Sequence, residues 1–390
     1  MVIIYRVYLD DNIIHNPSAT AQQGLSCEDM VVSQSIDWEI NQFTFKMSQK
    51  HPAYNKVHVL RSRVKVYDGN GELFVGRVIR VDKAFDNTIT VTCEDRLAFL
   101  CDTVIEPIYT KGNSKYTSPP ETDSILGWLR FWLETANTAH NKMVNDDSRK
   151  FYAGTSDKTG TLLFQTQEPT TPFELCKKLL EKIDGYLVLR VGSDGKQYID
   201  FKSDFVDSTG AQIRSTQKIE FGKNILDIKN YLNGESLYTW LYPVGKLLDD
   251  PNKQHEGWQE RRTILADGVS GTRYVKNETL ESLYGRIIGT ATWDDIDDPQ
   301  TLKNLAQGMV NGQSLKTSLT ITAFDLSILD SDISRIEVGQ YVNVISKPHD
   351  LNVWLLCKEK SIDLTHPEKS TVTLGATQAT ISRAAAGWKD

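Results

Sequence analysis

Four carboxylates crowd one short stretch of the chain, where Asp294, Asp295, Asp297 and Asp298 lie just before Pro299. Oxygen-rich clusters of this kind bind Ca²⁺ or Mg²⁺, and paired carboxylates hydrolyse glycosidic bonds. The stretch lacks the glycine and the distal glutamate of an EF-hand loop. Acids at a helix start are also stabilised by the helix dipole. We therefore expect Asp298 to cap a helix that begins at Pro299, and we assign no catalytic residue and no metal ligand.

The histidines and cysteines form no metal-binding or nucleophile motif. The chain contains no HExxH, GxSxG, GxGxxG or P-loop sequence, so no motif supports a zinc peptidase, a serine hydrolase or a nucleotide site. The cysteines are odd in number and lack a CxxC pair, which indicates neither a disulfide framework nor a zinc knuckle. We expect small buried residues at Cys27, Cys93, Cys101, Cys176 and Cys357. The histidines are isolated: His15, His51, His58, His140, His255, His349 and His366. We expect no cofactor.

Length and charge narrow the class of protein. At 390 residues the chain is long enough for two to four compact units. Its formal net charge of -7 argues against a protein that neutralises nucleic-acid phosphates, although an acidic protein can line a channel that DNA passes without binding. No apolar run approaches membrane-spanning length, so we expect no stable membrane insertion. Met1 to Leu9 alternates like a strand and unlike a signal peptide, so we expect synthesis and first folding in a cytoplasm.

Two stretches have the pattern of a three-strand meander. The first runs from Val64 to Leu100, with turns at Asp68 to Gly71 and at Asp86-Asn87. It ends at Asp95, the expected N-cap of a short helical turn. The second runs from Tyr341 to Gly375 and has strand, turn, long strand, turn and short strand in the same order. An internal repeat would change the expected architecture, although any two antiparallel meanders share this pattern.

Other segments alternate between strand and helix patterns. Period-two spacing predicts strands at residues 2–9, 30–35, 38–47, 186–191, 197–201, 219–232 and 238–245. Helices are predicted to follow the N-cap residues Asp123, Thr171, Asn277 and Asp298. Trp128 and Trp132 fall in the apolar stripe of the first of these helices. Such a stripe could be a ligand platform, but core packing is the commoner cause.

The expected fold class is α+β and multidomain, with two small β-barrels and two α+β parts. A loop rich in Pro, Thr and Ser that ends at Pro119-Pro120 marks a boundary. The expected parts are a first barrel at residues 1–106, an α+β domain at 107–215, a second barrel from 216–246 with 318–381, an α+β insertion at 247–317 and a tail at 382–390.

A succession of short motifs resembles the prophage tail protein family, the N-terminal modules of tail-associated lysins and endopeptidase tail proteins of phages of Gram-positive hosts. Phe74 to Val78 is similar to the family's F-x-G-R-V signature, and Cys93 to Asp102 to its C-E-x-x-L-a-x-L-x-D signature. Further matches follow in order at Ala139-His140-Asn141, Gly185-Tyr186-Leu187, Ile219–Asn224, Thr239–Gly245, Tyr284-Gly285, Trp293–Ile296, Ala323–Leu326, Val338-Gly339 and Leu374-Gly375. The ordered succession covers almost the whole chain.

The resemblance implies a fold similar to the central baseplate hub of contractile phages. Two barrels per subunit would form, in a homotrimer, a ring of six similar barrels beneath a six-fold tail tube or distal tail protein ring. The implied function is structural: the hub joins the tube to the host-facing tip and gates release of tape measure protein and DNA. A receptor-binding tip protein is a further implied partner. The implied location is the virion tail tip, assembled in the host cytoplasm.

The residues expected to carry this function form surfaces and no catalytic site. We place the trimer and ring contacts on the two meanders, at Val64, Val66, Phe74, Arg77, Val91, Tyr341, Val344, Trp354 and Val372. In this family a lysin or peptidase region usually follows the module, so the resemblance implies no enzyme within it. The alternative function is a tail-associated cell-wall hydrolase or peptidase that uses acids of residues 293–298. A carbohydrate-binding adhesin, which would use the tryptophans, is a third possibility.

Overall fold

The computed structural model describes most of the chain, in two compact units. The described residues are 5–17, 24–68, 71–107, 122–143, 146–164, 166, 168–233, 237–248, 262–269, 272–294, 296–313, 316–328 and 333–375. The large unit comprises residues 1–228 with 320–376, and the small unit comprises 229–319 with 377–390. The boundary falls within the strands β14 (Ile225–Asn233) and β19 (Lys316–Ala323). In the described ranges, none of the helices combines the length and apolar character needed to cross a bilayer.

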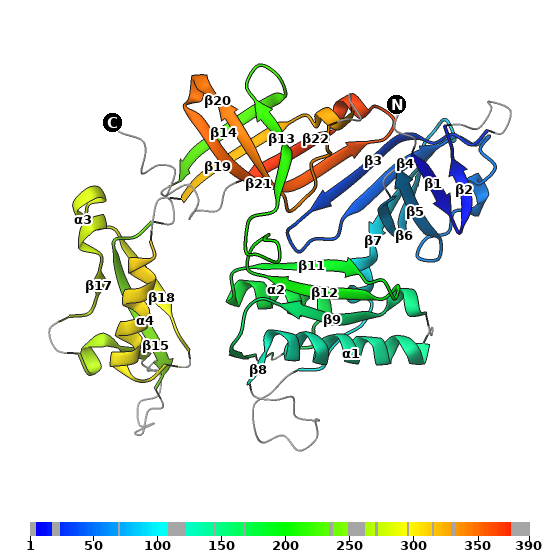
Figure 1. The fold of residues 1–390 in the computed structure, drawn as a ribbon. Helices are drawn as coiled ribbons and strands as arrows, with labels where there is room; N and C mark the ends of the chain where they lie inside the picture. The colour runs from blue at the N-terminus through cyan, green and yellow to red at the C-terminus, as the bar shows by residue number, and fades with distance from the viewer. Residues whose placement is uncertain are drawn as a thin grey trace. The chain divides into compact units, whose positions relative to one another are not determined.

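The first half of the large unit is a sheet built around the first predicted meander (Figure 1). Its strands are β1 (Arg6–Leu9), β2 (Asn12–His15), β3 (Glu28–Ser35), β4 (Gln42–Met47), β5 (Arg63–Asp68), β6 (Gly71–Lys83) and β7 (Ile89–Asp95). Their order in the sheet is β3-β4-β7-β6-β5-β1-β2. The Asp95 carboxylate caps the 3-10 helix Arg96–Cys101 by accepting a hydrogen bond from the Leu97 N–H at 2.9 Å. The predicted meander and its capped turn are therefore confirmed.

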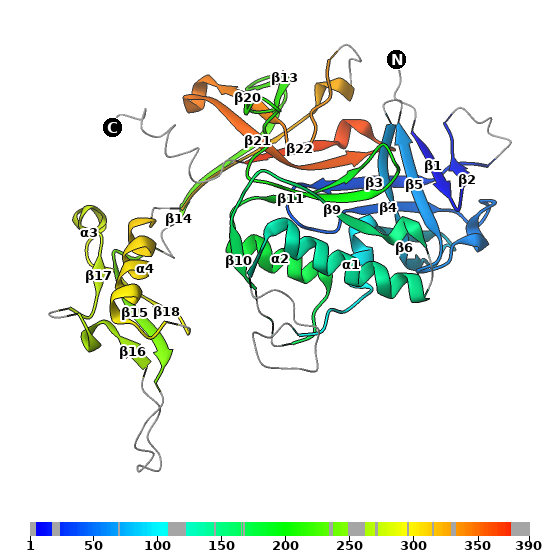
Figure 2. The same cartoon turned by 60° about the horizontal axis from the view of Figure 1, so that its bottom comes forward.

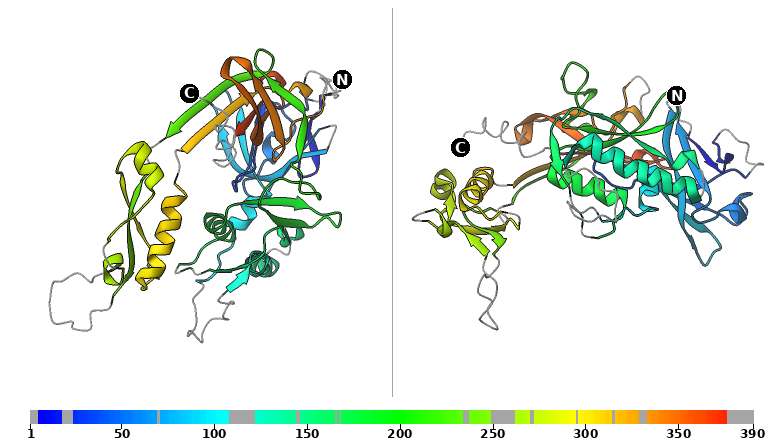
Figure 3. Two further views of the ribbon diagram at one scale, coloured as in Figure 1. Left: turned by 60° about the vertical axis from the view of Figure 1, so that its left-hand side comes forward. Right: turned by 90° about the horizontal axis from the view of Figure 1, so that it is seen from below.

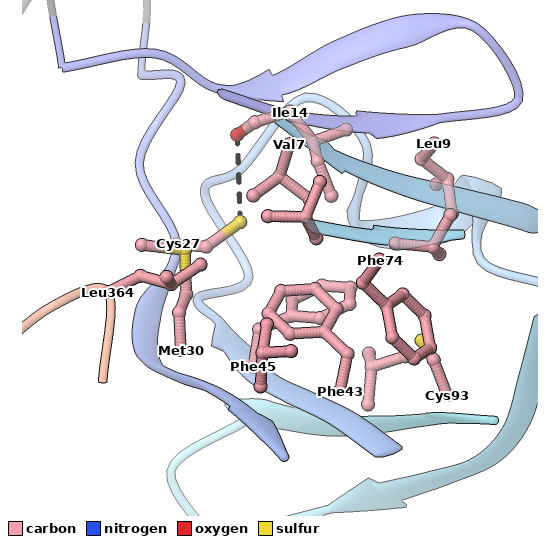
Figure 4. Close-up of a cluster of buried hydrophobic side chains, with 14 of the residues drawn as sticks. Val7, Leu9, Ile14, Cys27, Met30, Phe43, Phe45, Phe74, Cys93 and Leu364 are labelled. Atoms are coloured by element: carbon pink, nitrogen blue, oxygen red, sulfur yellow. Dashed lines mark hydrogen bonds between the residues drawn. The ribbon is translucent and has the colours of Figure 1, made fainter. Parts of the chain in front are cut away.

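Apolar side chains at alternate strand positions fill one face of this sheet (Figure 4). Phe43, Phe45 and Met47 are at most 1 % exposed, as their period-two spacing predicts. Leu364, which follows β21 (Leu351–Asp363), packs into the same core. The first core therefore includes a side chain from near the other end of the described chain.

An α+β part follows in the sequence. Its elements are β8 (Thr122–Ser124), α1 (Ile125–Met143), β9 (Phe151–Ser156), β10 (Thr161–Leu163), α2 (Pro172–Lys182), β11 (Tyr186–Val191) and β12 (Gln197–Lys202). The two helices lie side by side (Figure 2). Thr171 caps α2 and Pro172 is its first residue, as predicted. Trp128 and Trp132 are fully buried and stack with their ring centroids 5.9 Å apart, so the tryptophan stripe belongs to the core.

The second meander lies in the same sheet as the first. β20 (Tyr341–Ser346), β21 and β22 (Thr371–Gly375) pair antiparallel in order, β19 pairs with β22, and β13 (Arg214–Glu220) runs parallel to β20. β21 also pairs antiparallel with β3, from Glu359 opposite Ser35 to Asp363 opposite Val31. Thirteen strands thus form one curled sheet, and no pairing among the described strands closes either half into a complete barrel.

The two meanders match in strand length as well as in order. β5, β6 and β7 have 6, 13 and 7 residues, and β20, β21 and β22 have 6, 13 and 5. The similarity seen in the sequence pattern therefore extends to the lengths of the folded strands.

The small unit is a four-stranded sheet with a helix packed on it (Figure 3). Its elements are β15 (Trp240–Leu247), β16 (Arg262–Ile264), β17 (Val275–Lys276), α3 (Glu278–Tyr284), β18 (Ile288–Thr292) and α4 (Pro299–Asn311). β15 is antiparallel to β16 and β17 and parallel to β18. Leu302, Ala306 and Val310 of α4 form a buried cluster with Leu241 and Val275 of the sheet.

Several local predictions are wrong, among them a helix cap and one strand. The N-cap of α1 is Ser124, whose hydroxyl accepts a hydrogen bond from the Gly127 N–H at 3.0 Å, whereas Asp123 lies in β8. The strand predicted at residues 219–232 is interrupted between β13 and β14, where Gly222 adopts φ +81° in a turn that a residue with a side chain disfavours. The boundary at Pro119-Pro120 and the tail at 382–390 lie outside the described residues.

The sheet and the α+β part share a core. Trp38, predicted to start a strand, lies outside β4, and its indole Nε1 donates to the Phe173 carbonyl at 3.0 Å. Leu97 and Leu100 of the 3-10 helix pack in the same core as Trp128. The capped turn after β7 therefore anchors the first sheet in the α+β part.

Three arginines surround the ring of Phe99 in this anchor. The guanidinium carbons of Arg63, Arg77 and Arg149 lie 4.4, 4.9 and 5.2 Å from the ring centroid. Arg63 and Arg77 belong to β5 and β6, while Arg149 lies between α1 and β9. Cations over an aromatic face are attracted by the ring quadrupole, more strongly when water is excluded. The ring therefore joins the sheet to the α+β part.

Carboxylates balance the three cations. Arg77 donates two hydrogen bonds to Asp102, at 2.5 and 2.9 Å, and its Nε donates to Glu94 at 2.8 Å. Asp146 accepts from Arg63 at 2.6 Å. Burial acts to lower the pKa of Arg77, but its bonds to Asp102 and Glu94 outweigh burial, so the pKa lies above its ordinary value.

A buried ion pair lies in the second half of the sheet. The Lys360 Nζ lies 3.1 Å from the Asp325 carboxylate, and both side chains are at most 2 % exposed. Asp325 also accepts from the Gln217 side chain at 2.9 Å and from the Ser327 and Ile336 N–H groups at 3.1 Å. Burial acts to raise the pKa of Asp325, but Lys360 and these hydrogen bonds hold it below its ordinary value.

Two histidines hold together opposite ends of the first half of the sheet. His51 Nδ1 accepts from the Ala53 N–H at 3.1 Å, so its Nε2 carries the hydrogen donated to the Ile14 carbonyl at 2.8 Å. His15 Nδ1 accepts from the Cys27 N–H at 3.1 Å, which ties β2 to the residue before β3. Burial lowers the pKa of both histidines, so both are neutral near pH 7.

Replacing Arg77 by Met should lower the free energy of unfolding by about 3 kcal/mol, because Glu94 and Asp102 would lose the cation that neutralises them in a water-poor site. Chemical denaturation of the full chain measures this. Arg80→Met is the matched control on the same strand, since Arg80 and its partner Asp82 are 69 % and 54 % exposed and should change stability by less than about 0.5 kcal/mol. Equal effects of the two variants would contradict the prediction.

His51→Gln should make the free energy of unfolding less sensitive to acid. In the unfolded chain His51 takes up a proton near pH 6.5, whereas in the folded state burial lowers its pKa. The stabilisation by neutral His51 is therefore complete above pH 6.5 and is lost as the pH falls below that value. The stability advantage of the wild type over His51→Gln should therefore shrink between pH 7 and pH 5 in urea titrations. His366→Gln, at an exposed histidine, is the control. Parallel pH profiles for wild type and His51→Gln would refute this.

Candidate functional site

The acidic stretch before α4 folds as a helix start, as predicted. Asp298 accepts a hydrogen bond from the Thr301 N–H at 2.7 Å, and bonds from Thr301 hold its pKa below the ordinary value. Asp294 forms an ion pair with Arg262, while Asp295 lies outside the described residues. The described ranges contain no group of three or more His, Cys, Asp or Glu side chains placed to hold a metal ion.

The carboxyl group with a raised pKa also has structural partners. Burial raises the pKa of Asp95 to about 6, against the effect of its hydrogen bonds. Its oxygens accept from the Leu97 N–H and from the Asn41 side-chain amide at 2.8 Å. Asp95 therefore fixes the start of the 3-10 helix and the approach to β4. Cys101 is exposed, so the prediction that every cysteine is buried is wrong for this one.

Most of the side chains predicted to form the trimer and ring contacts lie in the core of the single chain. Eight are buried: Val64, Val66, Phe74, Arg77, Val91, Tyr341, Val344 and Val372. Trp354 is half-buried, and the Arg214 guanidinium lies 4.3 Å from its ring centroid. Buried side chains cannot themselves reach a second chain. That the strands of the two meanders carry the trimer and ring contacts stays a prediction. The contacts would have to be made by the outward-facing residues that alternate with the nine predicted ones.

The F-x-G-R-V motif has a structural explanation. A Cβ at Gly76 would lie 1.9 Å from the Glu94 carbonyl oxygen, so close strand packing requires glycine there. Arg77, the next residue, forms the buried ion pairs beside Phe99. The motif thus specifies how β6 approaches β7 and how the sheet is anchored.

A hollow runs along the outer side of α1. It is lined by Phe131, Glu134, Thr135, Thr138, Ala139 and Lys142. The Thr135 and Thr138 hydroxyls donate to the carbonyls of Phe131 and Glu134, both at 2.8 Å, so they are engaged with the helix itself. The hollow therefore brings together no nucleophile and base.

The small unit presents a group of residues that the sequence analysis did not select. The Tyr274 ring lies 5.8 Å from the Trp240 ring and 5.4 Å from the Tyr242 ring, measured between centroids. The Arg286 guanidinium lies 4.2 Å from the Trp240 ring centroid. We call these four residues the aromatic face. The alternation of Trp240 and Tyr242 within a predicted strand could have indicated that these two side chains share one face. Tyr274 and Arg286 lie beside them only because distant segments come together in the folded unit.

Part of the chain is similar to a known protein family. Residues 213–385 match the model described as prophage endopeptidase tail. The motifs at Thr239–Gly245, Trp293–Ile296 and Val338-Gly339 fall inside this range, whereas those at Phe74–Val78 and Cys93–Asp102 lie before it. No curated protein sequence matches the chain.

Solved phage tail proteins have the same fold over nearly the full length. The tail protein from Neisseria meningitidis MC58 is 11 % identical with a TM-score of 0.59, covering 97 % of this chain and 98 % of that one. The prophage MuSo2 43 kDa tail protein from Shewanella oneidensis is 12 % identical (TM-score 0.55, 96 % and 98 % covered), and prophage tail protein gp18 from Listeria monocytogenes EGD-e is 12 % identical (TM-score 0.50, 99 % and 98 % covered). Residues 213–385 are therefore similar to the prophage endopeptidase tail family, within a chain that has the fold of solved tail proteins.

Proposed function

We propose that this chain is the structural hub of a phage tail tip or baseplate. Three copies form a ring of six similar half-barrels, which joins the tail tube or a distal tail protein ring to the host-facing tip. The ring surrounds the path along which tape measure protein and DNA leave, so the chain gates their release. Its location is the virion tail, and a receptor-binding tip protein is a further partner.

The observation that carries the proposal is the pair of meanders with strands of 6, 13 and 7 and of 6, 13 and 5 residues. A three-fold object beneath a six-fold ring must present six similar surfaces, and closed cyclic symmetry with two repeats per chain supplies them. The β3–β21 ladder supports this, because it fixes the spacing of the two repeats within one sheet.

Charge also favours a conduit over a nucleic-acid binder. The net charge of -7 gives DNA little reason to adhere through its phosphates. A channel that DNA must traverse rapidly needs such weak attraction. DNA would therefore pass without specific binding.

Two of the four candidate acids of the cell-wall hydrolase alternative have partners within the fold. Asp298 is engaged as a helix cap and Asp294 in an ion pair with Arg262. Both arrangements have structural explanations that require no substrate. A structural role accounts for these acids more simply.

Light scattering of the purified full chain should give three times the chain mass at high concentration, because ring closure needs three copies. The measurement covers a wide concentration range, alone and with the distal tail protein. A monodisperse monomer under all these conditions would contradict the hub.

The purified chain should release no soluble fragments from peptidoglycan of Gram-positive cell walls, because Asp294 and Asp298 have partners within the fold. Muramidase in the same assay is the positive control. Release that is abolished by Asp294→Asn or Asp298→Asn would instead establish the hydrolase.

A further inference from the structure

Exposed apolar side chains are concentrated in the small unit. Among the described residues, seven of the fourteen large exposed apolar side chains belong to it, although it holds less than a third of the chain. They are Leu247, Leu283, Tyr284, Ile287, Ile288, Leu305 and Met309. This enrichment of exposed apolar side chains points to an interaction surface within the small unit.

The strand register places part of this surface beside the aromatic face. Trp240 lies opposite Ile288 and Tyr242 opposite Thr290, and residues directly opposite each other share one side of a sheet. Ile288 is 48 % exposed. The neighbouring residue Leu241 points to the other side, where α4 covers it. The aromatic face is therefore the side of the sheet that α4 leaves open.

Ring geometry favours a protein as the occupant of the aromatic face. The Tyr274 ring stands edge-on to Trp240 and Tyr242, at interplanar angles of 67° and 66°. Arg286 already covers the Trp240 ring at 4.2 Å. A sugar or a nucleic-acid base needs a flat, free ring to stack on, which this arrangement does not offer. Trp, Tyr and Arg packed against one another are the residues that anchor protein interfaces.

Charge points to a neighbour with carboxylates. Arg286 makes no ion pair with any residue that the structure describes, whereas nearby Lys276 lies 3.4 Å from Glu278 and 3.3 Å from Glu281. A chain of net charge -7 itself supplies acidic surface. In a three-fold ring each contact joins two different surfaces, so the Arg286 of one copy meets another region of the next copy and not its own equivalent.

We propose that the aromatic face binds a second copy of this chain, head to tail, with Arg286 facing carboxylates of the neighbour and Ile288 buried in the contact. This inference rests on the proposed trimeric hub and names part of the surface that holds it together. The small unit then contributes to ring closure, together with the two meanders.

Two substitutions in the full chain test the contact by sedimentation equilibrium. Arg286→Glu reverses the exposed charge, and Thr290→Glu adds a carboxylate, which those of the neighbour would repel, at an exposed position of the same face. Each should raise the concentration at which half of the chain is trimeric by at least about tenfold. Arg273→Glu is the matched control, because Arg273 is exposed in the same unit but outside the aromatic face, and it should leave that concentration unchanged.

The outcomes separate the two proposals. Weakened trimers for Arg286→Glu and Thr290→Glu, with an unchanged control and unchanged circular dichroism, support the contact. Trimers of wild-type strength in both variants overturn the contact and leave the hub intact. A wild-type chain that is monomeric throughout overturns both.

Discussion

The backbone ladder between β3 and β21 sets the geometry of the large unit. It joins the two meanders into one sheet, so neither can shift without breaking main-chain hydrogen bonds. A slip of one residue would turn every buried side chain of the ladder to the opposite face. Contacts beyond the ladder hold the register: the Leu364 N–H donates to the Met30 carbonyl at 2.8 Å, and Arg335 forms an ion pair with Asp68. Main-chain pairing and side-chain contacts thus specify the same arrangement.

Buried charges reinforce this geometry within the ladder. Lys360, opposite Gln34 in the ladder, pairs with Asp325 in a site from which water is almost excluded. Burying two charges costs desolvation that their attraction only partly returns, so such pairs specify an arrangement more than they stabilise it. The arginines around Phe99 have a similar role between the sheet and the α+β part, where they are the partners of three carboxylates. Both clusters restrict how the parts of the large unit can pack.

The sequence predicted correctly those features that depend on interactions between residues close together in the chain. The Thr171-Pro172 and Asp298-Pro299 helix starts and both meanders depend on neighbouring residues, and they formed where expected. The parallel pairing of β15 with β18 and the ladder of β21 with β3 join distant segments that no local pattern links. Except for Arg77, the predicted contact residues are apolar residues of strands, and most of them face the core because burial of apolar surface drives folding. The aromatic face was missed because its four residues come from separate segments.

Because β21 lies late in the sequence, β3 is synthesised long before its partner strand. β3 is complete when Ser35 is made, but its partner in the ladder is not complete until Asp363. At ribosomal rates of about 5–20 residues per second, the edge of β3 stays unpaired for a time on the order of tens of seconds. An open edge accepts any strand of suitable sequence, including the β21 of another nascent chain. When many chains are made close together, this strand would therefore be exchanged between copies and yield interlocked chains, whereas dilute synthesis leaves each β3 to pair with its own β21.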